Sequence, residues 1–151
     1  MFNQCNKLIE VTGLEGYTTY AESMFAYCRL LESVDLSKLD TSQCTSMRFM
    51  FEHSGLKEVP KLNTNQCTNM SGMFGDTQIV TADLRGWNLS NVTDMTYMFS
   101  VAFNLQTLYM DSELNPNLKV SYMFSNITTE GTFYYNPAYD YSKIIAALPA
   151  T

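Results

Sequence analysis

Four cysteines and a single histidine are the residues of this sequence best suited to bind a metal ion or to act as nucleophile and base. Zinc sites and redox-active dithiols commonly space two cysteines as Cys-x-x-Cys, and no such pair occurs here. His53 is the only histidine, so the sequence offers no zinc ligand set of recognised spacing. We therefore predict no metal site and no cofactor.

Other catalytic motifs are missing as well. The sequence has no Gly-x-Ser-x-Gly elbow, no glycine-rich phosphate loop and no paired acidic motif, so we expect a protein that is not an enzyme. Asp35, Asp83, Asp94 and Asp111 could offer oxygen ligands to calcium, but their spacing fits no known calcium loop.

The charge pattern argues against nucleic acid as a partner. Nine basic residues stand against 15 acidic ones, and they are scattered singly from Lys7 to Lys143 without forming a basic patch. No apolar run reaches the roughly 18 residues that a membrane span needs, and the N-terminal residues do not have the form of a signal sequence. We expect no nucleic-acid binding and no direct membrane insertion.

The dipeptide Met-Phe recurs through the chain and defines an internal repeat. Successive copies lie 23, 26, 23, 25 and 25 residues apart. A unit of this length cannot bury its own apolar side, so neighbouring units must stack. The six anchors are Met1, Met24, Met50, Met73, Met98 and Met123.

Each unit contains the pattern of one helical turn, one strand and one polar return. Met47, Met50 and Phe51 lie at positions i, i+3 and i+4, which predicts a short helix or 3₁₀ turn at each anchor. Alternating runs follow the anchors and predict strands, and runs of Ser, Thr, Asn and Asp then predict turns. The predicted inner face of the strands is Val34, Leu36, Val59, Ala82, Leu84, Leu108 and Met110.

The cysteines occupy repeated slots in these units. Cys5 and Cys28 each follow an anchor methionine by four residues, whereas Cys44 and Cys67 each precede the next anchor by six. Val92 fills the second slot in the following unit, so we interpret the cysteines as small core residues. Disulfide pairing between neighbouring coils stays open, because stacking alone does not guarantee the required geometry. The predicted structural core includes Phe25, Phe51, Phe74, Phe99, Phe124, Cys28, Cys44 and Cys67.

The pattern predicts a repeat solenoid over residues 1–126 and a capping segment over residues 127–151. In the cap, Thr132–Tyr135 is predicted as a strand and Asp140–Leu148 as a short helix, with Asp140 or Ser142 as N-cap and Pro149 after it. The first unit replaces the return motif with residues 15–20, so we expect that part to be irregular. It also begins inside a repeat, which suggests a fragment of a longer chain.

These repeats resemble the BspA-like leucine-rich-repeat surface proteins of bacteria and protists. The matching pieces are the start Met24-Phe25-Ala26-Tyr27-Cys28, the strand Val34-Asp35-Leu36-Ser37, and the return from Trp87 to Met95 with its Asn-Val-Thr-x-Met ending. The resemblance implies an α/β solenoid of the leucine-rich-repeat type, with about six stacked coils, a short parallel sheet and helical turns opposite. It also implies a secreted or cell-surface protein, and some members of this family are associated with adhesion.

The outward positions of the predicted strands form the candidate binding face. Solenoid curvature creates extended surfaces of this kind, and Tyr and Arg are frequent energetic anchors of interfaces, so Arg85 and Tyr109 are the leading candidates. A second candidate is the cap with its tyrosines, Tyr122, Tyr134, Tyr135, Tyr139 and Tyr141. The candidate face comprises Asp35, Ser37, Glu58, Asp83, Arg85, Thr107, Tyr109 and Asp111.

Two functions agree with this pattern. The first is a surface-displayed recognition or adhesion module that binds an extracellular protein or carbohydrate through the candidate face. The second is a structural spacer or stalk within a larger surface protein, for which the same face is ordinary solvated surface. The sequence leaves the oligomeric state and the ligand open.

Overall fold

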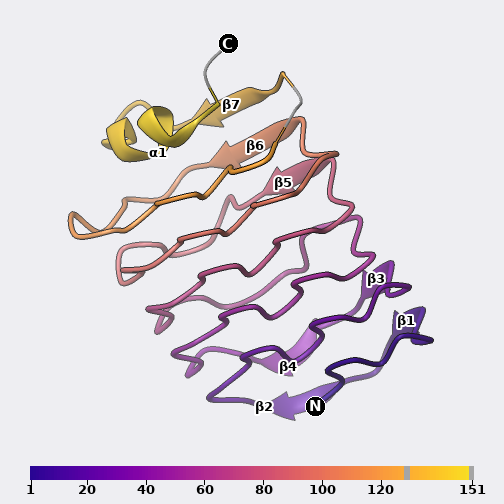
Figure 1. Cartoon of the computed structure of the whole chain (residues 1–151). Helices are drawn as coiled ribbons and strands as arrows, with labels where there is room; N and C mark the ends of the chain where they lie inside the picture. The colour runs from indigo at the N-terminus through magenta and orange to yellow at the C-terminus, as the bar shows by residue number, and fades with distance from the viewer. Residues whose placement is uncertain (128–129, 150–151) are drawn as a thin grey trace.

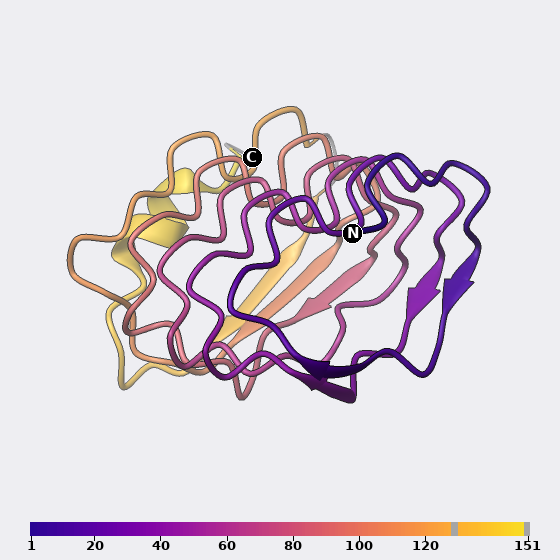
Figure 2. The same cartoon turned by 90° about the horizontal axis from the view of Figure 1, so that it is seen from below.

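The chain forms a solenoid of stacked coils with parallel strands. The computed structural model describes residues 1–127 and 130–149, and it has about five turns with little helix. The coils stack in order from the N-terminus to the C-terminus (Figure 1). Figure 2, turned by 90°, shows that successive coils follow similar oblong outlines. The predicted solenoid of parallel strands is confirmed.

Short strands pair side by side in the first two coils. β1 (Glu10–Val11) pairs with β3 (Ser33–Val34), and β2 (Glu15–Tyr17) pairs with β4 (Lys38–Asp40), both in parallel. The second pair corrects a prediction, because residues 15–20 of the first coil were expected to be irregular. Once Gly16 lies opposite Leu39, this segment gains ladder hydrogen bonds that its own composition does not predict.

Three further strands form a parallel sheet in the last coils. They are β5 (Thr81–Asp83), β6 (Thr107–Met110) and β7 (Thr132–Tyr135), in that spatial order. β7 confirms the strand that was predicted in the cap. No strand is assigned at the corresponding part of the third coil in the described residues, where Pro60 lies. Proline has no N–H to donate to a ladder, which accounts for the interruption between β3 and β5.

Each Met-Phe anchor lies in a run of tight turns, so the predicted helix at this position is wrong. In the second coil the N–H groups of Met24 and Ala26 donate to carbonyls three residues earlier, at 3.3 and 3.2 Å. The intervening N–H groups of Phe25 and Tyr27 donate to the next coil instead, both at 2.8 Å. Because every second N–H donates to the neighbouring coil, these residues cannot form the consecutive internal hydrogen bonds of a helix.

Left-handed backbone is the conformational feature that permits these turns. The residue before the anchor and the third residue after it both have positive φ, as at Ser23 (51°) and Tyr27 (60°). Such values occur at the third position of type II turns. Ser23 holds that position in the turn that the bond from Met24 N to Ala21 O closes. The same pair of positions repeats from coil to coil, and Gly72 (62°) occupies one of them.

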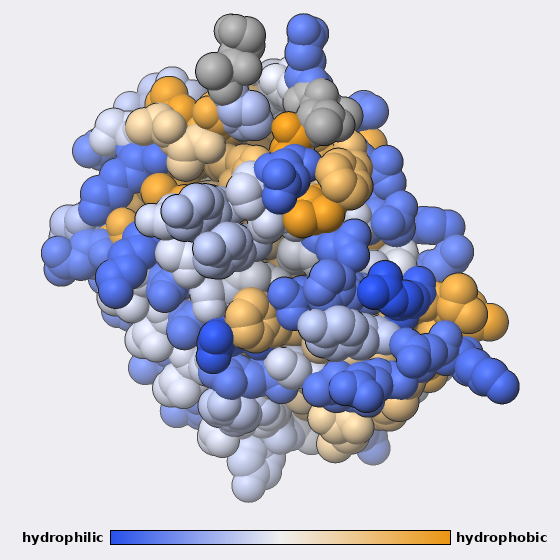
Figure 3. Space-filling model, in the orientation of Figure 1, coloured by the Kyte–Doolittle hydropathy of each residue, from blue (hydrophilic) through white to orange (hydrophobic). Residues whose placement is uncertain are grey.

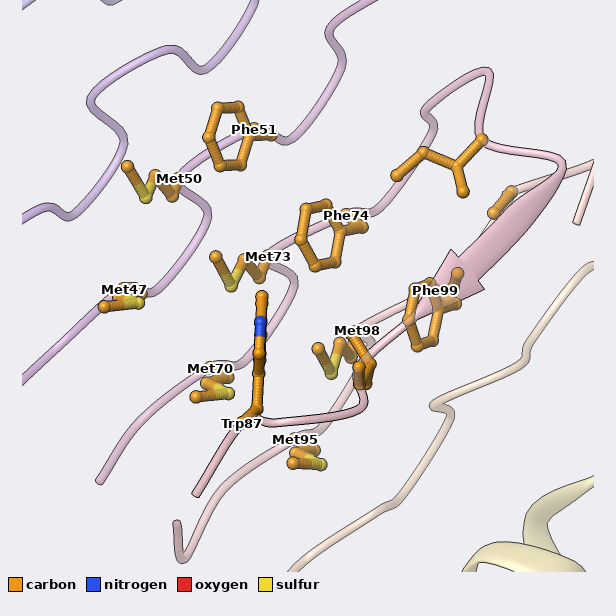
Figure 4. Packing of buried hydrophobic residues seen from close by; sticks show 14 of the residues in the cluster. Met47, Met50, Phe51, Met70, Met73, Phe74, Trp87, Met95, Met98 and Phe99 are labelled. Atoms are coloured by element: carbon orange, nitrogen blue, oxygen red, sulfur yellow. The ribbon is translucent and has the colours of Figure 1, made fainter. Parts of the chain in front are cut away.

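The core is built from columns of identical side chains. Phe25, Phe51, Phe74 and Phe99 are fully buried, and their rings stack at centroid distances of 5.3 to 5.7 Å. Figure 4 shows Phe51, Phe74 and Phe99 of this column beside two columns of methionine, with the Trp87 ring lying among them. Phe124 extends the aromatic column, 6.0 Å from Phe99. The predicted core position of the phenylalanines is confirmed.

The predicted cysteine slots and inner strand face are also found in the core. Cys28, Cys44 and Cys67 are fully buried, whereas Cys5 is partly exposed. All four are free thiols. Of the predicted inner face, Val34 and Val59 are partly buried. The other members are buried: Leu36, Ala82, Leu84, Leu108 and Met110.

A short helix, α1 (Ser142–Ala147), packs at the C-terminal end of the stack (Figure 1). It is shorter than the predicted Asp140–Leu148, and Tyr141 is its N-cap residue. The Asp140 carboxylate, which was a predicted N-cap, accepts the N–H of Ser142 at 2.9 Å from the position just before the N-cap residue. Residues 128, 129, 150 and 151 of the proposed cap lie outside the described residues.

Candidate binding face

The outward positions of β5, β6 and β7 form an ordered polar surface. The registers place Asp83 opposite Tyr109 and Tyr109 opposite Tyr134. Because side chains at matched positions of parallel strands project from the same face, these three residues form one column. The alternation predicted from the sequence is therefore found here, with Ala82 and Leu108 pointing to the core.

Arg85 is fixed at one end of this column by two contacts. Its Nε and Nη2 atoms donate to the Asp83 carboxylate at 2.9 and 2.7 Å. Its guanidinium also lies over the Tyr109 ring, 4.6 Å from the centroid, a cation–π arrangement. Tyr109 in turn stacks on Tyr134, with ring centroids 4.8 Å apart and planes 11° from parallel. The result is a guanidinium followed by two phenol rings.

The ion pair between Arg85 and Asp83 keeps both side chains charged. The hydrogen bond from Arg85 lowers the pKa of Asp83, and the same bond raises the pKa of Arg85, so both groups are ionised at neutral pH. Asp111 adds a second carboxylate nearby and accepts the backbone N–H of Gly86 at 3.0 Å. The two carboxylates outnumber the one guanidinium, so the cluster has a net negative charge.

The structure brings together only part of the predicted face. Asp83, Arg85, Tyr109 and Asp111 belong to this cluster, and Thr107 lies on the same strand as Tyr109. Asp35, Ser37 and Glu58 come from the second and third coils, on the far side of the sheet interruption at Pro60. All three are exposed.

Asp35 has a local structural role that sequence reasoning did not assign. Its carboxylate accepts the N–H of Ser37 at 2.9 Å, and hydrogen bonds from Ser37 lower its pKa. Asp83 makes the equivalent bond to the N–H of Arg85 at 3.1 Å. These aspartates therefore stabilise turns that follow the strands.

Ser37 lines a shallow, open groove next to the candidate face. The groove has a volume of about 450 Å³ and lies between the polar turns of the second and third coils. Lys61 and Asn65 line its other side, and Gly86 reaches it from the fourth coil. It is formed mostly by turn residues and contains no cluster of charged groups.

Tyr134 is the functional candidate that the sequence assigned to the wrong surface. It was grouped with the cap tyrosines, yet it extends the Tyr109 column on the sheet. The coil period contained the necessary signal, since Tyr134 follows Tyr109 by one repeat length of 25 residues. By contrast, Tyr141 is buried, donates its hydroxyl to the carbonyl of Ser112 at 2.7 Å, and burial raises its pKa to about 12.

The surface as a whole is mixed. Figure 3 shows hydrophilic and intermediate residues over most of one face, with apolar atoms in small separate areas. An exposed pair of stacked tyrosines, Tyr97 and Tyr122, lies away from the sheet, with centroids 5.1 Å apart. No single large apolar patch marks a membrane-binding or obligate interface on the face in view.

A polar column at the anchor turns contains the histidine. His53 Nδ1 lies 2.6 Å from the Asp76 carboxylate, and the Tyr27 ring lies against the imidazole at 4.7 Å. Within the described part of the chain, no group of three or more His, Cys, Asp and Glu residues could hold a metal ion. No described helix is long and apolar enough to cross a membrane.

Comparison with known proteins identifies a family that covers most of the chain. The family model described as "Mycoplasma protein of unknown function, DUF285" matches residues 18–132, which span the repeats from the second coil to β7. No curated protein and no solved structure matches the chain at a significant level.

Proposed function

The chain belongs to this DUF285 family, and from that premise we propose that it is a non-catalytic recognition module displayed on a cell surface. The proposal includes the finer repeat type, a BspA-like, leucine-rich-repeat-like array with six coils, one for each Met-Phe anchor. The partner is an extracellular protein or carbohydrate, and the binding surface is the exposed face of β5, β6 and β7. The module needs no cofactor and catalyses no reaction.

The column of Arg85, Tyr109 and Tyr134 is the observation that carries this proposal. Arginine and tyrosine are enriched among residues that dominate binding energy, and these three are ordered before any partner arrives. The Asp83 bonds and the ring contacts hold Arg85, so little side-chain entropy is lost on binding. A solvated surface does not require this arrangement, because the arginine is 55% exposed and could extend into water.

The contacts also define which atoms are available to a partner. Arg85 covers one face of the Tyr109 ring and Tyr134 covers the other, so Tyr109 offers its edge and hydroxyl. Tyr134 is 51% exposed. Since the net charge of the chain is −6, a strongly anionic partner is disfavoured, and a neutral glycan or a neutral to basic protein surface is preferred.

Alanine replacement of Arg85 and Tyr109 tests the proposal. The intact chain is screened against a glycan array and a panel of extracellular matrix proteins, and the affinity for any partner is then measured for the double variant. We expect a loss of at least about tenfold, which corresponds to roughly 1.4 kcal/mol. The matched control replaces Tyr97 and Tyr122, a stacked aromatic pair away from this sheet.

Two outcomes would count against the sheet face. Equal affinity of the Arg85/Tyr109 double variant and the unmodified chain would place binding elsewhere. Loss of binding in the Tyr97/Tyr122 control alone would move the site to that pair.

The alternative is a structural spacer, and the continuous inter-coil hydrogen bonds favour it. Bonds such as Phe51 N to Met73 O (3.0 Å) and Phe74 N to Met98 O (2.9 Å) repeat along the stack and make it rigid. A spacer has no partner to lose, so a screen without any binding partner supports it. The two functions are compatible with one fold, and the screen decides between them.

A further inference from the structure

The cysteines form two pairs in neighbouring coils, and the two pairs have different surroundings. Cys5 and Cys28 share one column, and Cys44 and Cys67 share another, each pair 23 residues apart. All four are free thiols in the structure. The proposed binding function uses none of them.

Backbone hydrogen bonds place Cys5 directly opposite Cys28. The N–H of Phe2 donates to the carbonyl of Met24, and the N–H of Gln4 donates to the carbonyl of Ala26, both at 2.8 Å. This register continues to Cys5 and Cys28. Neighbouring parallel segments lie about 4.8 Å apart. That separation falls within the roughly 4.4–6.8 Å between Cα atoms that a disulfide bridges.

The two residues also meet at one carbonyl oxygen. The Phe2 oxygen accepts the N–H of Cys5 at 3.1 Å and the thiol of Cys28 at 2.9 Å. The Cys28 sulfur therefore points across the coil boundary toward the turn that contains Cys5. Burial raises the pKa of the Cys28 thiol, and a backbone hydrogen bond with Cys5 acts in the opposite direction and lowers it.

Cys44 and Cys67 also lie opposite each other, because Ser46 pairs with Asn69 in parallel, but their thiols share no acceptor. Each thiol donates within its own coil, Cys44 to the carbonyl of Ser46 at 3.3 Å and Cys67 to that of Asn69 at 3.5 Å. Both side chains are fully buried. Burial raises the pKa of both thiols, that of Cys67 to about 11, so neither offers a reactive thiolate to an oxidant. Cys5, in contrast, is partly exposed.

We propose that Cys5 and Cys28 are a site of oxidative modification, at which a peroxide forms a disulfide that joins the first coil to the second. The Cys5 sulfur attacks the peroxide, so an S–O bond forms, the O–O bond breaks, and water leaves. The Cys28 sulfur then attacks the Cys5 sulfur. An S–S bond forms, the S–O bond breaks, and a second water carries away the Cys28 proton. Two thiols are oxidised and one peroxide is reduced.

Oxidation of the intact chain with hydrogen peroxide, followed by trypsin digestion, tests this assignment. Remaining thiols are first alkylated under denaturing conditions. Cleavage after Lys7 and Arg29 separates Cys5 from Cys28, so the disulfide appears in mass spectra as peptide 1–7 joined to peptide 8–29. We expect the number of free thiols to fall from four to two, and dithiothreitol to restore it.

Variants distinguish a specific pair from general oxidation. Cys44→Val, which introduces the residue that Val92 supplies in the same column, should form the disulfide at the same rate as the unmodified chain. Cys5→Ser should form none and retain three thiols. A major product that joins peptide 39–48 to peptide 62–85, an intermolecular dimer, or four unmodified thiols would each overturn the proposal. The peptide mapping and the thiol count use the unmodified chain, so both remain valid even if a variant folds poorly.

Discussion

Truncation of Phe74 is the strongest test of the aromatic column. The Phe74 side chain is fully buried, and its ring lies 5.7 Å from both the Phe51 ring and the Phe99 ring. The indole of Trp87 lies 6.2 Å away. Phe74→Ala therefore removes contacts to two neighbouring coils at once, at a position where the stack cannot collapse without moving both.

The expected loss follows from this geometry. Removing a buried phenylalanine ring costs about 3–5 kcal/mol of unfolding free energy, and the two stacked neighbours place Phe74 at the upper end of that range. For a domain of this size, roughly 2–4 °C of melting temperature corresponds to 1 kcal/mol, so we expect a decrease of about 10–15 °C. Phe2 stacks on only one ring among the described residues and is partly exposed, so Phe2→Ala should cost about half as much or less.

Urea unfolding measures both variants. Circular dichroism gives the unfolding free energy, and the fluorescence of Trp87, the only tryptophan, reports directly on the side chain beside Phe74. If Phe74→Ala loses less than about 1 kcal/mol, the ring does not have the core role derived from its burial. If Phe2→Ala costs as much as Phe74→Ala, stability does not depend on the number of stacked neighbours, and the column argument fails.

Four further variants test features of individual residues. Val101 has φ of 60°, which is strained for a β-branched residue, so Val101→Asn should raise the unfolding free energy by about 1 kcal/mol in urea titrations. Ser54 is buried and its hydroxyl has no hydrogen-bond partner among the described residues, so Ser54→Ala should stabilise the fold by about 1 kcal/mol in the same titrations. Thr77→Val removes the 2.9 Å bond from the Thr77 hydroxyl to the Phe74 carbonyl, so it should destabilise the fold by about 1 kcal/mol. Hydrogen bonds lower the pKa of Asp35 and of Asp83 in the folded chain, so their contribution to stability is present above the unfolded pKa of about 3.9 and is lost as the pH falls through the lower folded pKa. The urea concentration at the unfolding midpoint should therefore decrease when the pH is lowered below about 4. This decrease should be less steep in the double Asp→Asn variant.

Each of these has a clear contrary result. A reciprocal change, Asn126→Val at φ of 58°, should destabilise, and a gain there would refute the strain argument. A loss of stability in Ser54→Ala would mean that the hydroxyl is satisfied, for example by water. An unchanged acid slope in the aspartate variant would show that these turns contribute nothing to the pH dependence.

The repeat period predicted the solenoid because buried side chains recur at matching positions. Ala82 and Leu108 were placed on the inner face from alternation alone, and both are buried. The anchor turns were predicted as helical because i, i+3 and i+4 spacing suits any tight turn that returns side chains to one side. The deciding factor is the inter-coil hydrogen bonding of Phe25 and Tyr27, which depends on a neighbour that a single repeat does not reveal.

The candidate face was predicted in part for a related reason. Alternation identified Asp83, Arg85 and Tyr109 as outward residues, but it did not show that they touch. The parallel register sets that contact, and the same register brings Tyr134 from the predicted cap onto the sheet. Pro60 was visible in the sequence, yet its consequence for the sheet appears only when the neighbouring strands are paired.

The columns of identical side chains allow such a chain to change in length by whole coils. At the anchor turns each interior coil donates to the next coil in a similar register, as Phe51 does to Met73 and Phe74 to Met98, whereas on the strand side Lys57 and Gln106 donate to the previous coil. A gene duplication that inserts one complete coil therefore creates two junctions of a kind that already exists, and an in-frame deletion of one coil rejoins matching surfaces. Coil number can vary by recombination without new packing chemistry, whereas an insertion of a few residues within an anchor turn would break the register of every column at once.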